Sequence, residues 1–147
     1  MTLTTLASND SGITKYLKQV YSYPLLTDEE ETDLTTRWCN DGDLEAAHKL
    51  VRSHLRLVVK IAFSFRRYGA VLADMISEGN IGLMKAVKKF RLDAGCKLAT
   101  YAAWWIKSTI QEYILRSWSL LKINTTSLKQ RLFSGLKQNK EKIEKTA

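Results

Sequence analysis

From Leu44 to Tyr68, apolar residues recur at steps of three and four, and no glycine or proline interrupts the run. This is the period of one face of an α-helix, whereas a half-buried strand requires a period of two. We therefore expect one long helix over residues 44–68, ended by Gly69. The chain contains a single proline, Pro24, and no segment that alternates cleanly between apolar and polar residues. Together these features predict an all-α fold.

Capping residues and breaks predict the remaining helices. A short helix over residues 13–21, with Ser11 as a candidate N-cap, is broken at Pro24. Thr27 and Glu30 have the spacing of a capping box, so a second helix should run from there to about Cys39. Asp43 should cap the long helix. Further helices are predicted over residues 72–90, from residue 97 or 98 to 118, and from residue 125 or 126 into the 140s.

The charges are distributed unevenly along the chain. Residues 1–50 carry four Lys or Arg and nine Asp or Glu, whereas residues 51–147 carry nineteen and six. A basic segment of this size is typical of proteins that bind nucleic acid. The alternative is an ordinary solvated basic surface.

Several classes of function are not expected. The sequence has no glycine-rich phosphate loop, nucleophile elbow or HExxH motif, so we do not predict an enzyme or a cofactor. Two cysteines and two histidines without paired spacing do not indicate a zinc site. The N-terminus lacks the pattern of a signal peptide, and no apolar run is long enough to span a membrane. We expect a cytoplasmic protein that does not bind membranes.

Aromatic and basic residues are combined in the predicted helix that ends at residue 118. Tyr101, Trp104 and Trp105 lie between lysines and arginines, and bases of a single strand stack on aromatic rings. Helical geometry separates two stripes. The first, expected in the core, is Leu98, Ala102, Trp105, Thr109 and Tyr113; the second, expected to be free for binding, is Tyr101, Trp104, Ser108 and Gln111. The alternative is that neighbouring helices bury both stripes.

Gly79 and Gly82 lie inside the predicted helix over residues 72–90, where each glycine costs about 1 kcal/mol relative to alanine. Two interpretations remain open. Either the glycines allow close packing against another helix of the same domain, or they belong to a face that docks on a partner. Both can also hold, on different sides of the helix.

Three motifs, in this order, resemble bacterial sigma factors of the primary-type class: SHLRLVVKIA, DMISEGNIGLMKAVKKF and KLATYAAWWIKSTI. The resemblance covers roughly residues 12–118. The segments IQEYILRSW and KINTTSLKQRLFSGLK are more similar to the heat-shock (alternative) sigma subfamily. Residues 130–140 resemble a box typical of that subfamily, except at Ser134 and Gly135.

The resemblance implies a helical region 2 domain with short N-terminal helices and a basic C-terminal helix. Residues 1–12 would be disordered, 13–118 would form regions 1.2 and 2, and 119–147 would form a connector and the start of region 3. No counterpart of region 4, which reads the −35 element, follows. A fragment, a truncated gene product and a natural short form all remain open as explanations.

The resemblance also implies partners: core RNA polymerase, bound through the clamp coiled coil of its large subunit, and promoter DNA. The DNA would be the −10 element, together with the non-template single strand. The resemblance assigns polymerase docking to Asp74, Ser77, Glu78, Asn80 and Met84. It assigns DNA binding to Lys97, Tyr101, Trp104, Trp105, Lys107, Gln111 and Arg116.

Among the DNA-binding residues, Tyr101 would stack where a flipped adenine leaves the duplex, and Trp104 and Trp105 would wedge and support that junction. Gln111 would read the upstream end of the −10 element while it is still paired. The resemblance also favours the docking interpretation of Gly79 and Gly82. Three positions depart from the family pattern: Ser77 replaces a frequent glutamine, and Cys96 and Leu98 replace aromatic residues.

We therefore predict a sigma factor that directs promoter recognition and melting, for heat-shock or stress genes. One alternative is a truncated sigma factor that competes for the polymerase clamp without initiating transcription. A second alternative, from another class, is a basic nucleic-acid-binding regulator unrelated to polymerase, which leaves the glycine-bearing EGNIG helix unexplained.

Overall fold

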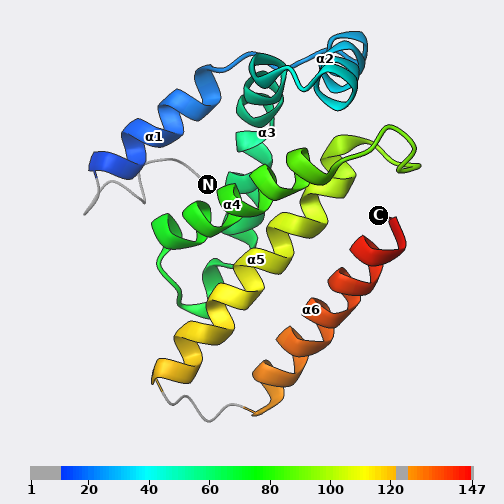
Figure 1. Ribbon diagram of the computed structural model, residues 1–147. Coiled ribbons are helices and arrows are strands. Elements are labelled where there is room, and N and C mark those ends of the chain that lie inside the picture. The colour runs from blue at the N-terminus through cyan, green and yellow to red at the C-terminus, as the bar shows by residue number, and fades with distance from the viewer. Residues whose placement is uncertain (1–10, 122–125, 147) are drawn as a thin grey trace.

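The computed structural model describes residues 11–121 and 126–146, and in this part of the chain every regular element is helical (Figure 1). The elements are α1 (Ser11–Ser22), α2 (Asp28–Asp41), α3 (Leu44–Ser64), the 3₁₀ turn η2 (Arg66–Tyr68), α4 (Leu72–Lys89), α5 (Leu98–Leu121) and α6 (Thr126–Thr146). The predicted all-α fold is confirmed.

The start of α2 is fixed by the capping box that the sequence predicted. The hydroxyl of Thr27 accepts a hydrogen bond from the backbone N–H of Glu30 at 3.2 Å, and the Glu30 carboxylate accepts one from the N–H of Thr27 at 2.9 Å. Each bond satisfies an amide that the first helical turn leaves unpaired. At the other end, Gly42 turns the chain with a φ of 65°, which favours glycine.

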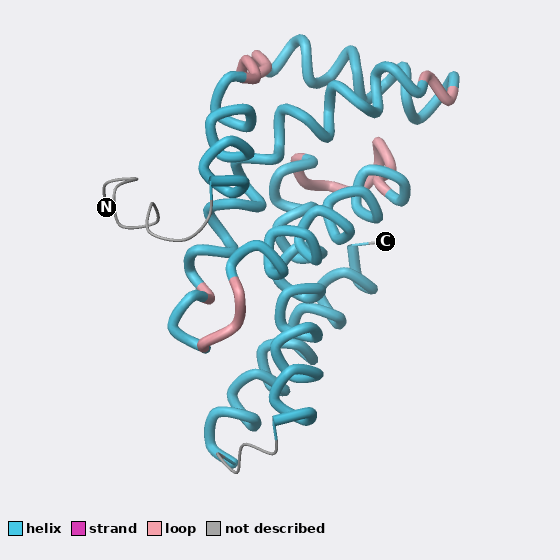
Figure 2. Tube along the Cα trace, turned by 90° about the vertical axis from the view of Figure 1, so that its left-hand side faces the viewer, coloured by secondary structure: helices cyan, strands magenta, loops and turns pink. Residues whose placement is uncertain are grey.

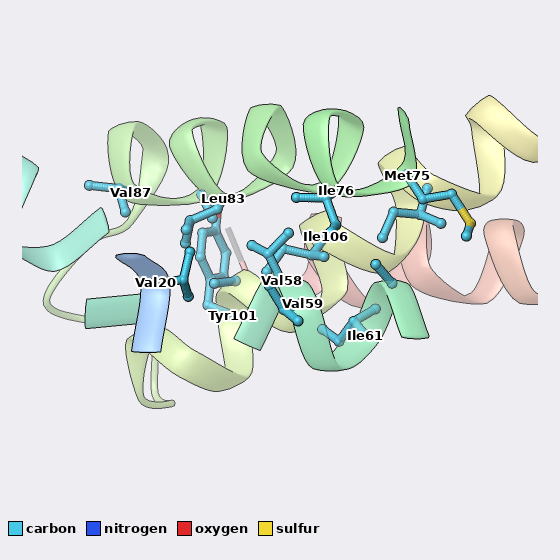
Figure 3. Packing of buried hydrophobic residues seen from close by; sticks show 14 of the residues in the cluster. Val20, Val58, Val59, Ile61, Met75, Ile76, Leu83, Val87, Tyr101 and Ile106 are labelled. Carbon is cyan, nitrogen blue, oxygen red and sulfur yellow. The ribbon is translucent and has the colours of Figure 1, made fainter. Parts of the chain in front are cut away.

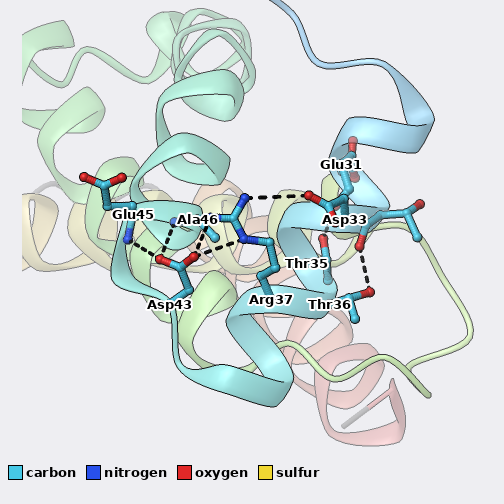
Figure 4. Close-up of polar contacts among 9 residues, drawn as sticks. Glu31, Asp33, Thr35, Thr36, Arg37, Asp43, Glu45 and Ala46 are labelled. Atoms are coloured by element: carbon cyan, nitrogen blue, oxygen red, sulfur yellow. Dashed lines mark hydrogen bonds and ion pairs between the residues drawn. The ribbon is translucent and has the colours of Figure 1, made fainter.

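Asp43 caps α3 and also ties it to α2 (Figure 4). Its carboxylate accepts hydrogen bonds from the N–H groups of Glu45 at 3.0 Å and Ala46 at 3.3 Å, and from Nε of Arg37 at 3.0 Å. The Arg37 hydrogen bond, followed by that from Ala46, holds the pKa of Asp43 below its usual value. One side chain therefore sets both the start of α3 and its angle to α2.

The core lies where α3, α4 and α5 meet, and α4 and α5 make the most extensive contact (Figure 3). Residues from all three helices are almost completely buried there, among them Val58, Leu83 and Ile106. The two internal glycines of α4 allow this contact. A Cβ atom at Gly79 would lie 2.7 Å from Cγ1 of Val58, and one at Gly82 would lie 2.8 Å from the carbonyl oxygen of Trp105. Close packing within the domain is thus confirmed for these glycines, whereas docking of this helix on a partner stays a prediction.

Helix α6 returns antiparallel along α5, on a side of α5 that α4 leaves uncovered (Figures 1 and 2). Among the described side chains of α6, Leu132, Leu136 and Ile143 are buried. The sequence predicted this helix, but not the surface against which it packs.

Some predicted boundaries were wrong. The long helix ends at Ser64 instead of Tyr68, because the chain tightens into η2 before Gly69 turns it with a φ of 78°. This turn brings the Tyr68 carbonyl within 3.4 Å of Nε1 of Trp118, which donates to it. Helix α5 continues past the expected end at residue 118 to Leu121, and Ser11 and Gly12 are helical although residues 1–12 were expected to be disordered. Residues 1–10 and 122–125 lie outside the described part.

Within the described residues, the helices are too short or too polar to cross a lipid bilayer.

Candidate docking and nucleic-acid surfaces

The outward side of α4 carries the residues to which the resemblance assigns polymerase docking. Three are exposed and two are half-buried: Asp74, Ser77 and Met84 in the first group, Glu78 and Asn80 in the second. Helical spacing places Ser77 and Met84 on the side opposite the buried glycines. Asp74, Glu78 and Asn80 lie at the edges of this side, and Glu78 is one turn before Gly82. The same side presents two apolar side chains to solvent, Ile81 at 41% and Met84 at 52% exposure. The exposure of Ile81 was not predicted from the sequence.

Two carboxylates on this side of α4 are paired with α5. The hydroxyl of Tyr113 donates to the Asp74 carboxylate at 3.0 Å, and Nη2 of Arg116 lies 3.5 Å from the Glu78 carboxylate. Burial, more than the nearby carboxylates, raises the pKa of Tyr113, so this phenol stays protonated as a donor. The expected docking residues are thus in contact with the helix that was expected to bind DNA.

Asn80 is held by α1. Its Nδ2 donates to the hydroxyl of Tyr16 at 3.0 Å, whereas its Oδ1 is buried and has no hydrogen-bond partner among the described residues. Both side chains line a hollow of about 300 Å³ between α1 and α4. No local pattern could signal this contact, because Tyr16 and Asn80 are 64 residues apart.

Tyr101 is buried, which corrects the expectation that it faces opened DNA. Only 1% of its surface is exposed, and its side chain lies among the core residues beneath α4 (Figure 3). Its ring packs edge-on against Phe90, with 5.4 Å between centroids, and against Trp105, at 6.4 Å. The ring is large and apolar enough to be drawn into the core, and its hydroxyl is left without a partner in the described structure.

The adjacent tryptophans differ in their surroundings. Trp105 packs against the core, as the helical geometry predicted, and Nζ of Lys89 lies 5.1 Å from the centre of its ring. Trp104 is half-buried, and within the described residues it is not part of the core cluster. The separation of the two side chains is therefore confirmed, although neither is fully buried or fully exposed.

Gln111 is only 8% exposed because α6 covers it. Its Oε1 accepts a hydrogen bond at 2.9 Å from Nδ2 of Asn139. Ser108, one turn earlier, is also buried. For Tyr101, Ser108 and Gln111, the alternative that both stripes of α5 are buried is correct.

The three cations expected to contact phosphates have different surroundings. Lys107 is exposed. Lys97 is also exposed, and its Nζ lies 3.2 Å from the Asp28 carboxylate of α2, while Arg116 pairs with Glu78. Ion pairs this exposed contribute roughly 0–1 kcal/mol, so a phosphate can replace the carboxylate at little cost.

A second hollow of about 300 Å³ lies between α2 and the segment that joins α4 to α5. Its lining includes Lys97, Phe90 and the two residues that replace the family's aromatics, Cys96 and Leu98. Phe90 therefore both lines this hollow and contacts the Tyr101 ring.

Neither cysteine is in a disulfide, and burial raises the pKa of the Cys39 thiol, whose sulfur donates to the Phe90 carbonyl at 3.4 Å. No group of three His, Cys, Asp or Glu side chains in the described part of the chain is arranged to hold a metal ion.

Comparison with known proteins gives a consistent result. Residues 50–120 match the family described as Sigma-70 region 2. The chain is 51% identical over 142 residues to the RNA polymerase sigma factor RpoH of Rhizobium radiobacter, covering 97% of this chain and 47% of that protein. The RpoH of Caulobacter vibrioides is 52% identical over 136 residues, which are 92% of this chain and 46% of the relative.

A relative with a different printed name, the RNA polymerase sigma-C factor of Myxococcus xanthus, is 46% identical over 138 residues, covering 94% of this chain and 46% of that protein. The chain therefore spans about half the length of the curated relatives it matches.

Proposed function

The chain belongs to the sigma-70 family through its region 2 domain and is of the RpoH heat-shock type; from this premise we propose that it binds core RNA polymerase and recognises and melts the −10 element of promoters. The observation that carries the proposal is that residues 50–120, which match region 2, contain both the outward side of α4 and the aromatic segment of α5. The function is that of an initiation factor, without catalysis of its own, and it is exercised in the cytoplasm on promoters of the heat-shock class.

The outward side of α4 is suited to docking on a helical partner. Exposed Ile81 and Met84 supply apolar surface, and Asp74, Ser77 and Glu78 on the same side supply polar contacts. An apolar centre with a polar rim is the usual composition of a specific interface. We assign this side to the clamp coiled coil of the polymerase large subunit. Gly79 and Gly82 contribute by holding α4 close to α5, not by touching the partner.

On α5, we assign the wedge at the opened junction to Trp104, with Trp105 supporting it from the core side. Lys97, Lys107 and Arg116 would contact phosphates. Extruding a base costs a few kcal/mol, which stacking and a pocket must offset. The hollow lined by Phe90, Cys96 and Leu98 is a candidate space for such a base. Because Tyr101 is buried and its ring packs against Phe90, stacking on it requires its neighbours to move.

Gln111 is assigned to the upstream, paired end of the −10 element. A glutamine amide can bond an adenine edge with both its donor and its acceptor. In the described structure the acceptor oxygen is already bonded to Asn139, so this role also requires a rearrangement.

The test is transcription with core polymerase and this chain on two templates, one premelted at −10 and one with an extended −10 element. Transcripts that depend on the chain would support the proposal. Binding to core polymerase without a transcript would favour a clamp competitor that does not initiate. Absence of binding to core polymerase would refute both functions.

A further inference from the structure

Helix α6 holds the one side chain that the proposed function needs for reading paired DNA. Asn139 donates to Oε1 of Gln111 at 2.9 Å, and Nζ of Lys140 lies 3.5 Å from the carboxylate of Glu112. The two contacts involve adjacent residues on both helices and fix the position of α6 along α5. They lie directly over the amide that would have to reach a base pair.

The backbone of α6 approaches this amide closely at Gly135. A Cβ atom at this position would lie 2.9 Å from Nε2 of Gln111. Gly135 is one of the two residues that depart from the subfamily's box, so this chain differs from the expected pattern at the point of contact. The donor end of the amide thus faces the α6 backbone while the acceptor end is bonded to Asn139.

Buried apolar side chains also hold α6 in place. Leu136 and Ile143 are each only 9% exposed, and they lie seven residues apart, on one side of α6. On α5, Ser108 lies in the same stripe as Gln111, is 6% exposed, and its hydroxyl has no hydrogen-bond partner among the described residues. Leaving such a group unpaired is unfavourable.

We propose that α6 is a displaceable cover over Gln111, so that the free chain binds paired −10 DNA weakly and gains affinity when α6 lifts. This inference rests on the proposed function. It follows from the geometry because a side chain 8% exposed cannot enter a groove. When the competent conformation is a minor one, the apparent affinity falls by the fraction of molecules that are open.

The first experiment opens the cover without changing α5. In the double variant Leu136→Asp, Ile143→Asp, the buried side of α6 becomes charged. The control, Ser134→Asp, Gln138→Asp, adds the same charge at two exposed positions of the same helix. Binding of a labelled −10 duplex is measured by fluorescence anisotropy. We expect the opened variant to bind about fivefold more tightly than the control, a factor set by the open fraction.

Hydrogen exchange on both variants serves as the check on folding: α6 should lose protection only in the opened variant, while α3 to α5 keep theirs. The gain in affinity should disappear on a scrambled duplex. It should also disappear when Gln111→Ala is added to the opened variant.

The second experiment closes the cover. A carbodiimide activates the Glu112 carboxylate, the Lys140 amine then forms an amide bond with it, and the reagent leaves as a urea. Both compared proteins carry Lys97→Arg, which removes the other lysine–carboxylate pair within 3.5 Å seen in the described residues. The matched control also carries Lys140→Arg, which keeps the ion pair but cannot be linked. We expect the linked protein to lose duplex binding at least tenfold relative to this control.

The outcomes separate this inference from the function on which it rests. Equal duplex binding by the opened, control and linked proteins would overturn the cover and leave the proposed function intact. No −10 binding by any of them, with core polymerase still bound, would overturn the cover together with the DNA role of α5. No binding to polymerase either would overturn the whole proposed function.

Discussion

Replacing Gly82 by alanine should destabilise the protein, although alanine is the better helix former. The gain in helix propensity is about 1 kcal/mol. Against it, the new methyl group would lie 2.5 Å from Oγ1 of Thr109, 2.8 Å from the carbonyl oxygen of Trp105 and 3.1 Å from Cα of Ile106. Two of these three atoms are backbone atoms of α5, so they cannot turn aside as a flexible side chain would.

The helices must therefore separate by several tenths of an ångström along their most extensive contact. Overpacking of this kind costs about 1–3 kcal/mol, and values at the upper end are expected where backbone is met. After the propensity gain, we expect a net loss of roughly 1–2 kcal/mol, or a fall in Tm of about 2–8 °C for a domain of this size.

The measurement is urea unfolding followed by circular dichroism, with Gly135→Ala as the control. A methyl group at Gly135 meets the amide end of Gln111, which is the far end of a flexible side chain. Gly135→Ala should therefore be neutral or stabilising. If Gly82→Ala proved as stable as the parent protein, α4 and α5 could not be packed as closely as described, and the assignment of this glycine to internal packing would be refuted.

Three further predictions concern the surfaces and the caps. Met84→Asp, on the outward side of α4, should weaken binding to core polymerase at least tenfold in a pull-down or anisotropy titration. Leu25→Asp should not, although Leu25 is 67% exposed against 52% for Met84; equal effects would refute the docking assignment. Trp104→Ala should weaken binding of fork-junction DNA and leave polymerase affinity within about twofold, since removing one stacking ring costs about 1–3 kcal/mol; a loss of helical circular dichroism would instead show that Trp104 is part of the core. Asp43→Asn keeps a capping oxygen but removes the charge that faces Arg37. Because the pKa of Asp43 is lowered in the folded state, its charge stabilises the fold at pH values above the ordinary aspartate pKa, and this contribution is lost as the pH falls through the lower folded value. The stability difference between parent and variant should therefore be present at pH 7 and shrink below about pH 4. A stability difference that does not depend on pH would contradict this.

The elements that sequence alone predicted correctly are those determined by neighbouring residues. The capping box of Thr27 and Glu30 and the cap at Asp43 both involve backbone partners within a few positions. Hydrogen bonds and turn geometry of this kind are legible in the order of residues. The family motifs, which also depend on local order and spacing, led to the same domain that the comparison with known proteins identified.

The features that could not be predicted depend on which helix packs against which. A helical wheel separates Trp104 from Trp105, but it cannot tell whether the stripe of Tyr101 and Gln111 meets solvent or another helix. That depends on α6, which reaches Gln111 through a residue 28 positions away. The inward direction of Gly82 could not be read from spacing either, since a close approach of two helices is visible only when both are placed.

The pairing of α4 carboxylates with α5 has a thermodynamic consequence for binding of the two proposed partners. Glu78 cannot bond a polymerase residue and Arg116 a phosphate while the two bond each other. When polymerase binds Glu78 it frees Arg116 for the phosphate, and when DNA binds Arg116 it frees Glu78 for polymerase. The gain in affinity must be equal in both directions. An exposed pair of this kind contributes up to about 1 kcal/mol, so polymerase and DNA should each strengthen binding of the other up to about fivefold through this contact. An ion pair that contributes little to the stability of the fold would thus favour the complex with both partners over the complex with either one. The effect would be the same whichever partner bound first.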